Sequence, residues 1–156
     1  MTIRELQPDD DLKAVLALCR DFFLEYESHH EEFFKIENLS DTDISGKFLE
    51  SMESDNSATI IALVNNKIVG YASIATREQP RFYKIKKVGT VSALMVAKEY
   101  RHRGIATRIM TEVKDYFRRR GIKYYTFYTA VSNKAATRLY EKIGMTALHT
   151  AFLAET

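Results

Sequence analysis

The segment Tyr100-Arg101-His102-Arg103-Gly104-Ile105-Ala106 joins an apolar run at residues 91–96 to a long amphipathic stretch at residues 105–117. This pattern predicts a strand that leads through an arginine- and glycine-bearing turn into a helix. Such a turn presents backbone N–H groups and the positive end of the helix dipole to whatever lies in front of it. The segment therefore predicts an anion-binding site, with phosphate as the commonest occupant.

The bulk properties indicate one domain, residues 1–156, with a single core. The chain has 156 residues and a mass of 18.0 kDa, a length at which roughly two-thirds of the unfolded surface becomes buried. Its one cysteine, Cys19, excludes an internal disulfide, and no Cys or His cluster has the spacing of a metal site. Since neither a signal peptide nor an apolar run of about 18 residues is present, we expect a cytoplasmic, metal-free protein outside the membrane.

Charge is unevenly distributed along the chain. Residues 1–57 hold 5 Lys and Arg against 15 Asp and Glu, a net charge of −10, whereas residues 58–156 hold 18 against 6, a net charge of +12. Two interpretations are open. The two parts attract each other within the fold, or the acidic part binds a cation while the basic part binds an anion.

Hydrophobic periodicity and turn residues predict the element order β-α-α-β-β-β-α-β-α-β and an α/β fold class. A hairpin turn is expected at Asn65-Asn66, and a bulge or close backbone approach at Gly70. A basic loop at 77–87 precedes the central strand. The predicted strands are 3–6, 59–64, 68–76, 90–96, 124–131 and 146–153, and the predicted helices are 12–26, 42–52, 104–120 and 133–143.

Four motifs in this order resemble one family. Arg101-His102-Arg103-Gly104-Ile105-Ala106 matches the pattern Arg or Gln, two residues, Gly, one residue, Gly or Ala. The strand Leu94-Met95-Val96 precedes it, Asn133 opens the next helix, and Tyr140-Glu141-Lys142-Ile143-Gly144-Met145 follows. Over essentially its whole length the chain resembles the GNAT superfamily of acyl-CoA-dependent N-acyltransferases.

The resemblance implies a GNAT fold: a mixed, mostly antiparallel sheet of six to seven strands, with a splay between the fourth and fifth strands and helices on both faces. It also implies acetyl-CoA as co-substrate, with the diphosphate on the turn and the pantetheine arm along the splayed strand. The implied cofactor-binding residues are Leu94, Met95, Val96, Arg101, His102, Arg103, Gly104, Ile105, Ala106, Thr107, Asn133 and Ala136.

Tyr140 is the predicted catalytic residue. It shares one helix face with Asn133 and Ala136 because these positions are three, four or seven residues apart. In the resembling family, an amine attacks the thioester directly and a tyrosine at this position gives a proton to the departing thiolate. The predicted function is therefore N-acetyl transfer to a primary amine in a ternary complex.

The base that deprotonates the amine is left open by the sequence. Many members of the resembling family carry a carboxylate on the strand before the turn, but this chain has none at residues 91–94. The open alternatives are a water relay at Ser92, Thr129 or Tyr128, a side chain among His29, His30, Glu31 and Glu32, or capture of an amine that is already neutral.

The acceptor is predicted to be a small or basic amine, or a peptide amine, because the first two helices of the resembling family form one wall of its site and residues 1–57 are acidic. The predicted acceptor-site residues are Phe23, Tyr26, Glu27, His30, Ser92 and Thr129.

Two other function classes compete with the enzyme. A nucleic-acid binder would use the basic residues of the helix at 104–120, but the balanced overall charge disfavours it, so no nucleic-acid partner is expected. An acyl-CoA-binding sensor would keep the cofactor site without catalysis; Tyr140 argues against it, and the missing strand carboxylate leaves it open. The predicted final strand, 146–153, also offers an edge through which a homodimer could pair.

Overall fold

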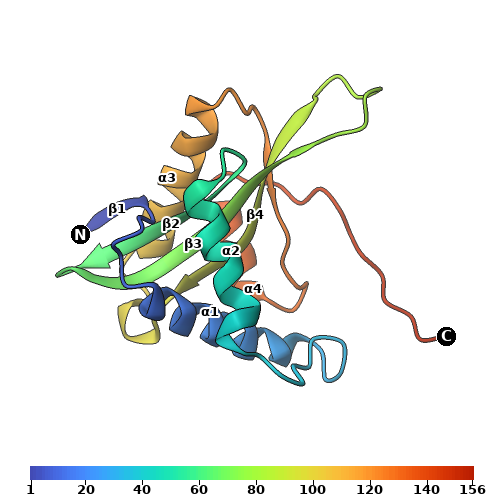
Figure 1. Ribbon diagram of the computed structural model, residues 1–156. Helices are drawn as coiled ribbons and strands as arrows, with labels where there is room; N and C mark the ends of the chain where they lie inside the picture. Colours follow the sequence, from blue (N-terminus) through green and yellow to red (C-terminus); the bar gives the residue numbers. More distant parts are fainter.

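Five strands form one sheet in the order β1-β2-β3-β4-β5 in the computed structural model, which describes residues 1–156 (Figure 1). Adjacent strands pair antiparallel except β4 and β5, which are parallel. The predicted mixed, mostly antiparallel sheet is confirmed, although with five strands rather than six to seven. The strands are β1 Thr2–Glu5, β2 Ser57–Val64, β3 Lys67–Glu78, β4 Lys87–Val96 and β5 Tyr125–Phe127.

The helices begin where side chains cap their free N–H groups. Asp11 accepts a hydrogen bond from the amide of Ala14 at the start of α1, and Ser40 and Asp43 form a reciprocal capping box at the start of α2. The helices are α1 Leu12–Tyr26, α2 Asp41–Glu53, α3 Ile105–Arg119 and α4 Lys134–Lys142, with two short 3-10 turns, η1 Glu27–His29 and η2 Lys98–Tyr100.

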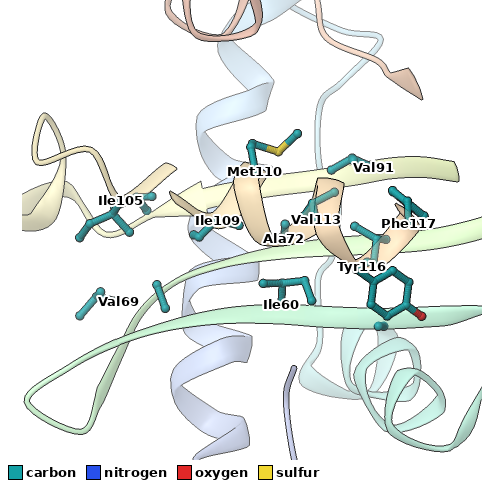
Figure 2. Close-up of a cluster of buried hydrophobic side chains, with 14 residues drawn as sticks. Ile60, Val69, Ala72, Val91, Ile105, Ile109, Met110, Val113, Tyr116 and Phe117 are labelled. Atoms are coloured by element: carbon teal, nitrogen blue, oxygen red, sulfur yellow. The ribbon is translucent and has the colours of Figure 1, made fainter. Parts of the chain in front are cut away.

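Helices cover both faces of the sheet, as predicted. On one face α1 and α2 pack against strand residues such as Ile61 and Tyr71. On the other face α3 packs against the alternate residues, including Ile60 and Ala72, because successive strand side chains point to opposite faces (Figure 2). Cys19 is buried on the α1 side, in agreement with a core role.

The sheet opens between β4 and β5. Their pairing covers only Gly89 to Val91 on β4 and Tyr125 to Phe127 on β5. Ser92 follows directly and has no partner on β3, since the register jumps from Ser73↔Ala93 to Ile74↔Val91. We call the point where this pairing ends, just beyond Val91 on β4 and Phe127 on β5, the fork. The predicted splay between the fourth and fifth strands is therefore present.

The C-terminal segment corrects the sequence prediction. The predicted strand at 124–131 shortens to three residues, and the predicted strand at 146–153 does not form. Leu148 and Phe152 lie 73% and 94% exposed, so the alternating pattern covers no core here. The physical reason is that a strand needs a partner edge, and β5 offers only three residues of edge within this chain.

No helix of the structure has both the length and the apolar character needed to cross a membrane. No group of three or more His, Cys, Asp or Glu side chains is arranged to hold a metal ion.

Candidate active site

The turn between β4 and α3, residues 101–107, is called the cofactor turn below. His102 and Gly104 have φ angles of 62° and 75°, and this alternation of left-handed backbone curls the chain so that successive N–H groups converge. No protein acceptor takes a hydrogen bond from the backbone N–H groups of residues 102–107, and Arg108 N to Gly104 O is the first bond of α3. The turn therefore presents a row of free donors at a helix N-terminus, which suits an anion.

A cavity of about 530 Å³ extends from the cofactor turn along the open edge of β4 to α4. It brings together segments from β4, the cofactor turn, the end of β5 and α4, which lie far apart in the sequence. Of the predicted cofactor-binding residues, all but Arg103 line it, and so does Tyr140. The lining includes Leu94, Met95, Val96, Arg101, His102, Gly104, Ile105, Ala106, Thr107, Asn133, Ala136 and Tyr140.

Arg103 lies outside that cavity. Its guanidinium stands 5.4 Å from the centre of the Tyr100 ring, and the side chain is exposed without a carboxylate partner. An exposed cation on an aromatic ring beside the free amides extends the positive potential of the turn toward solvent.

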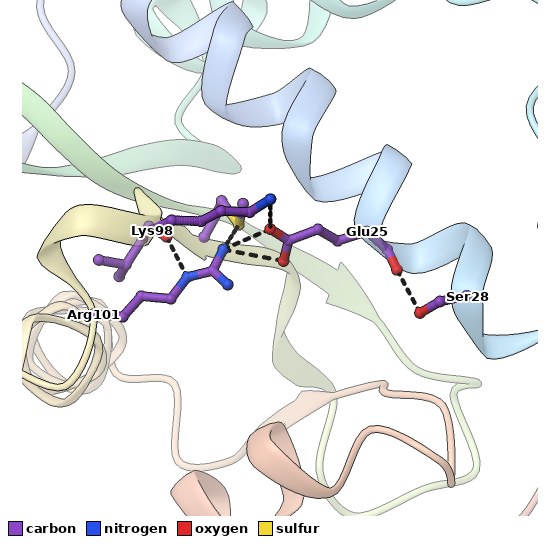
Figure 3. Close-up of polar contacts among 6 residues, drawn as sticks. Glu25, Ser28, Lys98 and Arg101 are labelled. Atoms are coloured by element: carbon purple, nitrogen blue, oxygen red, sulfur yellow. Dashed lines mark hydrogen bonds and ion pairs between the residues drawn. The ribbon is translucent and has the colours of Figure 1, made fainter.

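Arg101 is held by α1 rather than left free. Its Nη2 donates to both carboxylate oxygens of Glu25 at 2.8 and 3.0 Å, and its Nε donates to the carbonyl of Val96 at 2.9 Å (Figure 3). Lys98 Nζ approaches the same carboxylate at 3.7 Å. The first residue of the sequence motif thus ties the end of β4 to the last turn of α1.

Tyr140 faces the cavity from α4. Its ring packs on Phe127 with the ring centres 4.6 Å apart, and Asn133 at the start of the helix accepts a hydrogen bond from the amide of Ala136 at 3.2 Å. Burial, with a smaller contribution from Tyr26, raises the pKa of Tyr140 well above that of a free phenol. A phenol is already protonated in neutral solution, and burial only strengthens that preference, so the hydroxyl carries a proton that it could donate.

Aromatic side chains line the cavities next to the end of α1, where the acceptor was predicted. A second cavity of about 410 Å³ lies between the end of α1, β4 and Asn133. Phe22 and Tyr26 line both cavities and stack with ring centres 5.7 Å apart. Phe23, one residue on, lines neither and is 39% exposed, so the structure places Phe22 rather than Phe23 at the site.

Glu27 and His30 line neither cavity. Glu27 accepts a hydrogen bond from the amide of Ile36 at 2.8 Å and pairs with Lys35 at 3.8 Å. The His30 ring accepts hydrogen bonds from the two backbone amides that follow at 32 and 33. Both side chains shape the segment 27–36 instead of facing a ligand.

Of the two remaining predicted acceptor residues, Thr129 lines a cavity and Ser92 lines neither. Thr129 lines the larger cavity together with Tyr128. Ser92 lies at the fork, where its hydroxyl oxygen accepts a hydrogen bond from Lys47 Nζ at 2.8 Å. Desolvation around Lys47 lowers the pKa of its amine. No carboxylate takes part in this contact, in line with the strand sequence.

The sequence pattern did not single out two residues that line the cavities, Phe22 and Glu25, or the contact of Lys47 with Ser92. Phe22 and Phe23 are equivalent by periodicity, and only the packing of α1 on β4 separates them. Glu25 and Lys47 read as ordinary exposed helix charges, and each acquires its partner from a distant part of the chain. The only sequence signal for a role of Glu25 was its position one helical turn after Phe22.

Comparisons with known proteins identify the family of this chain and its fold. Residues 16–145 match the model of the acetyltransferase (GNAT) family. N-alpha-acetyltransferase 30 of Schizosaccharomyces pombe is 33% identical over 86 residues, which cover 55% of this chain and 55% of that protein. This chain thus spans just over half the length of that relative.

Solved structures share the fold. A tetramutant of a Bacillus halodurans protein has a TM-score of 0.85 at 19% identity over 100% of both chains. The aminoglycoside N-acetyltransferase AAC(6')-Iy in complex with CoA has a TM-score of 0.80 at 15% identity, covering 99% of this chain and 93% of that one. The family match spans most of the chain and the fold agrees with it, so this protein belongs to the acetyltransferase (GNAT) family.

Proposed function

We propose that this protein transfers the acetyl group of acetyl-CoA to a primary amine, by direct attack of the amine within a ternary complex. One observation carries the proposal. The unpartnered amides of residues 102–107 stand at one end of a continuous cavity, and the protonated Tyr140 hydroxyl lines the same cavity. An anion-binding end joined to a proton donor is what a phosphate-bearing thioester requires.

The cofactor turn fits the diphosphate of coenzyme A. Its free N–H groups and the start of α3 offer hydrogen bonds and dipole charge, and Arg103 adds a free cation nearby. A Cβ at Gly104 would meet no protein atom within 4 Å, so the space in front of the turn is open to a ligand.

The open edge of β4 fits the pantetheine arm. Ala97 N donates across the sheet to Val69 O, so by strand alternation the N–H and C=O groups of Leu94 and Val96 point the other way, into the splay. The amides of an extended arm can pair with such an edge as an added strand does. The thioester then comes near the fork.

The chemistry needs one bond made and one broken. The amine nitrogen forms a bond to the thioester carbonyl carbon, and the carbon–sulfur bond breaks. Tyr140 gives its hydroxyl proton to the departing sulfur, the amine loses a proton to water, and the Tyr140 phenolate takes a proton back from water. The position of Tyr140 in the cavity supports this role, and a phenol is protonated in neutral solution; burial raises its pKa, which makes it a weaker acid.

For the acceptor, we propose a small or peptide primary amine that enters past Phe22 and Tyr26. The relatives carry two kinds of name, N-alpha-acetyltransferase and aminoglycoside N-acetyltransferase, which support an amine acceptor. Charge supports a basic acceptor less than the sequence suggested, because Glu25 and Glu27 are already paired. The aromatic lining becomes the main recognition surface.

The test is release of free thiol from acetyl-CoA in the presence of a panel of amines: polyamines, amino acids, aminoglycosides and short peptides with free N-termini. We expect at least one amine class to give saturable thiol release and an acetylated product by mass spectrometry. Binding of CoA without turnover of any amine would favour the sensor function. Absence of CoA binding would overturn the proposal altogether.

A further inference from the structure

An ion pair joins two elements that carry different substrates in the proposed reaction. Glu25 belongs to the last turn of α1 and lines both cavities, and Arg101 belongs to the cofactor turn. The pair connects positions 76 residues apart, with Nη2 2.8 and 3.0 Å from the two carboxylate oxygens (Figure 3). The contact therefore fixes the distance between the end of α1, which carries Phe22 and Tyr26, and the cofactor turn.

Arg101 also ends the open edge of β4. Because Ala97 N points to β3, the carbonyl of Val96 points into the splay, and Arg101 Nε occupies it at 2.9 Å. The strand edge available to an extended ligand then consists of both polar groups of Leu94 and the N–H of Val96. The guanidinium thus sets where the free edge stops.

The guanidinium has little capacity left for a phosphate. Nε is used by Val96 and Nη2 by Glu25, with the sulfur of Met95 3.5 Å from the same nitrogen. Only Nη1 lacks a protein partner. The side chains of Arg101 and Glu25 are 32% and 38% exposed, so solvent screens the pair less than it screens Lys98, whose side chain is 74% exposed.

We propose that Glu25 is a positioning residue for acetyl transfer. It holds Arg101 against the Val96 carbonyl, and thereby fixes both the register of the pantetheine arm on β4 and the spacing between the thioester and the acceptor wall. The inference rests on the proposed function. It assigns Arg101 to the organisation of the groove, whereas the free amides and Arg103 receive the diphosphate.

A cycle of variants tests the pair: Glu25→Gln, Arg101→Gln and the double variant. Misplacing the reacting groups slows the chemical step, so we expect each single variant to lower kcat by about tenfold at saturating acetyl-CoA. The dissociation constant of CoA, measured by calorimetry without any amine, should change by less than about twofold. The double variant should be no worse than Arg101→Gln, because both changes remove one interaction.

The matched control is Glu112→Gln, which breaks the 2.8 Å ion pair with Arg119 on the surface of α3. It should leave kcat unchanged. Its thermal midpoint should shift by a small amount, similar to the shift that Glu25→Gln causes. A fall in kcat for Glu112→Gln equal to that of Glu25→Gln would overturn the positioning role. So would a double variant whose loss is the product of the single losses.

Opposite shifts in CoA affinity would also overturn the inference. If Arg101→Gln weakened CoA binding strongly while Glu25→Gln strengthened it, Arg101 would be a phosphate ligand that Glu25 holds back. Failure of the wild-type protein to bind CoA would instead count against the proposed function. The two failures are therefore distinguishable, since one appears in the variants and the other in the parent protein.

Discussion

The cofactor turn and the acceptor wall, here the last turn of α1 with residues 27–36, treat their polar groups in opposite ways. In the turn, the amides of residues 102–107 have no protein partner. In the wall, Glu27, Lys35 and His30 are engaged with each other or with neighbouring backbone. The turn is thus preorganised to receive a charged ligand, while the wall uses its charges to hold its own shape.

The turn and the wall differ in which substrate each can select. Free backbone donors recognise a feature common to all coenzyme A thioesters, so the turn selects the donor and not the acceptor. In the proposed reaction, acceptor selection falls to the side chains that face the cavity from α1, Phe22 and Tyr26. The net charge of residues 1–57 is a weaker guide than it seemed, because Arg101, which lies outside this range, neutralises Glu25.

The largest expected effect separates chemistry from binding. Tyr140→Phe removes the proposed proton donor and keeps the ring on Phe127. We expect kcat to fall by about 100-fold, because general acid catalysis contributes roughly 10² to 10⁴, with little change in CoA affinity. Steady-state kinetics and calorimetry measure the two quantities. A fully active variant would exclude Tyr140 as the acid.

The next effect tests the turn alone. Gly104→Ala forces a side chain into a left-handed position with φ of 75°, at a cost of roughly 1 kcal/mol, so the free amides no longer converge. We expect CoA to bind about fivefold to tenfold more weakly. Gly121→Ala is the matched control, since it has φ of 70° and equally open space at the other end of α3. Equal weakening by both variants would mean that general strain, and not the turn, determines affinity.

A smaller effect tests the wall. Phe22→Ala removes an aromatic surface that lines both cavities, and we expect the KM of the acceptor amine to rise by about fivefold while the KM of acetyl-CoA stays the same. Phe23→Ala serves as the control because its ring lines neither cavity. If the two variants behave alike, the acceptor does not use the face of α1 that the packing selects.

The smallest effect concerns pH. Burial raises the pKa of Tyr140, so its phenol remains protonated above pH of about 10, where a free phenol is half ionised. Between pH of about 9 and 10 we expect kcat to change by less than about twofold through this group. An alkaline fall in kcat centred at or below pH 10, present in the parent and missing in Tyr140→Phe, would contradict the raised pKa.

Much of the fold was readable because local signals sufficed. Periodicity predicted α1 and α2, whose starts Asp11 and Ser40 cap, and Asn65-Asn66 predicted a hairpin turn, where both residues adopt the left-handed conformation with φ of 50° and 61°. The C-terminal prediction failed because alternation specifies a strand only where an edge is available to pair with. That edge is a tertiary property, and β5 ends at Phe127.

By itself, the sequence determined the conformation of the turn at residues 101–107. Gly104 and the residues around it encode the turn through local backbone preferences, which need no distant partner. Only the tertiary structure decided which face of α1 meets the cavity, that Arg101 is bound by Glu25, and that Lys47 reaches Ser92. These contacts join residues 45 and 76 positions apart, and their energies depend on geometry that no local pattern records.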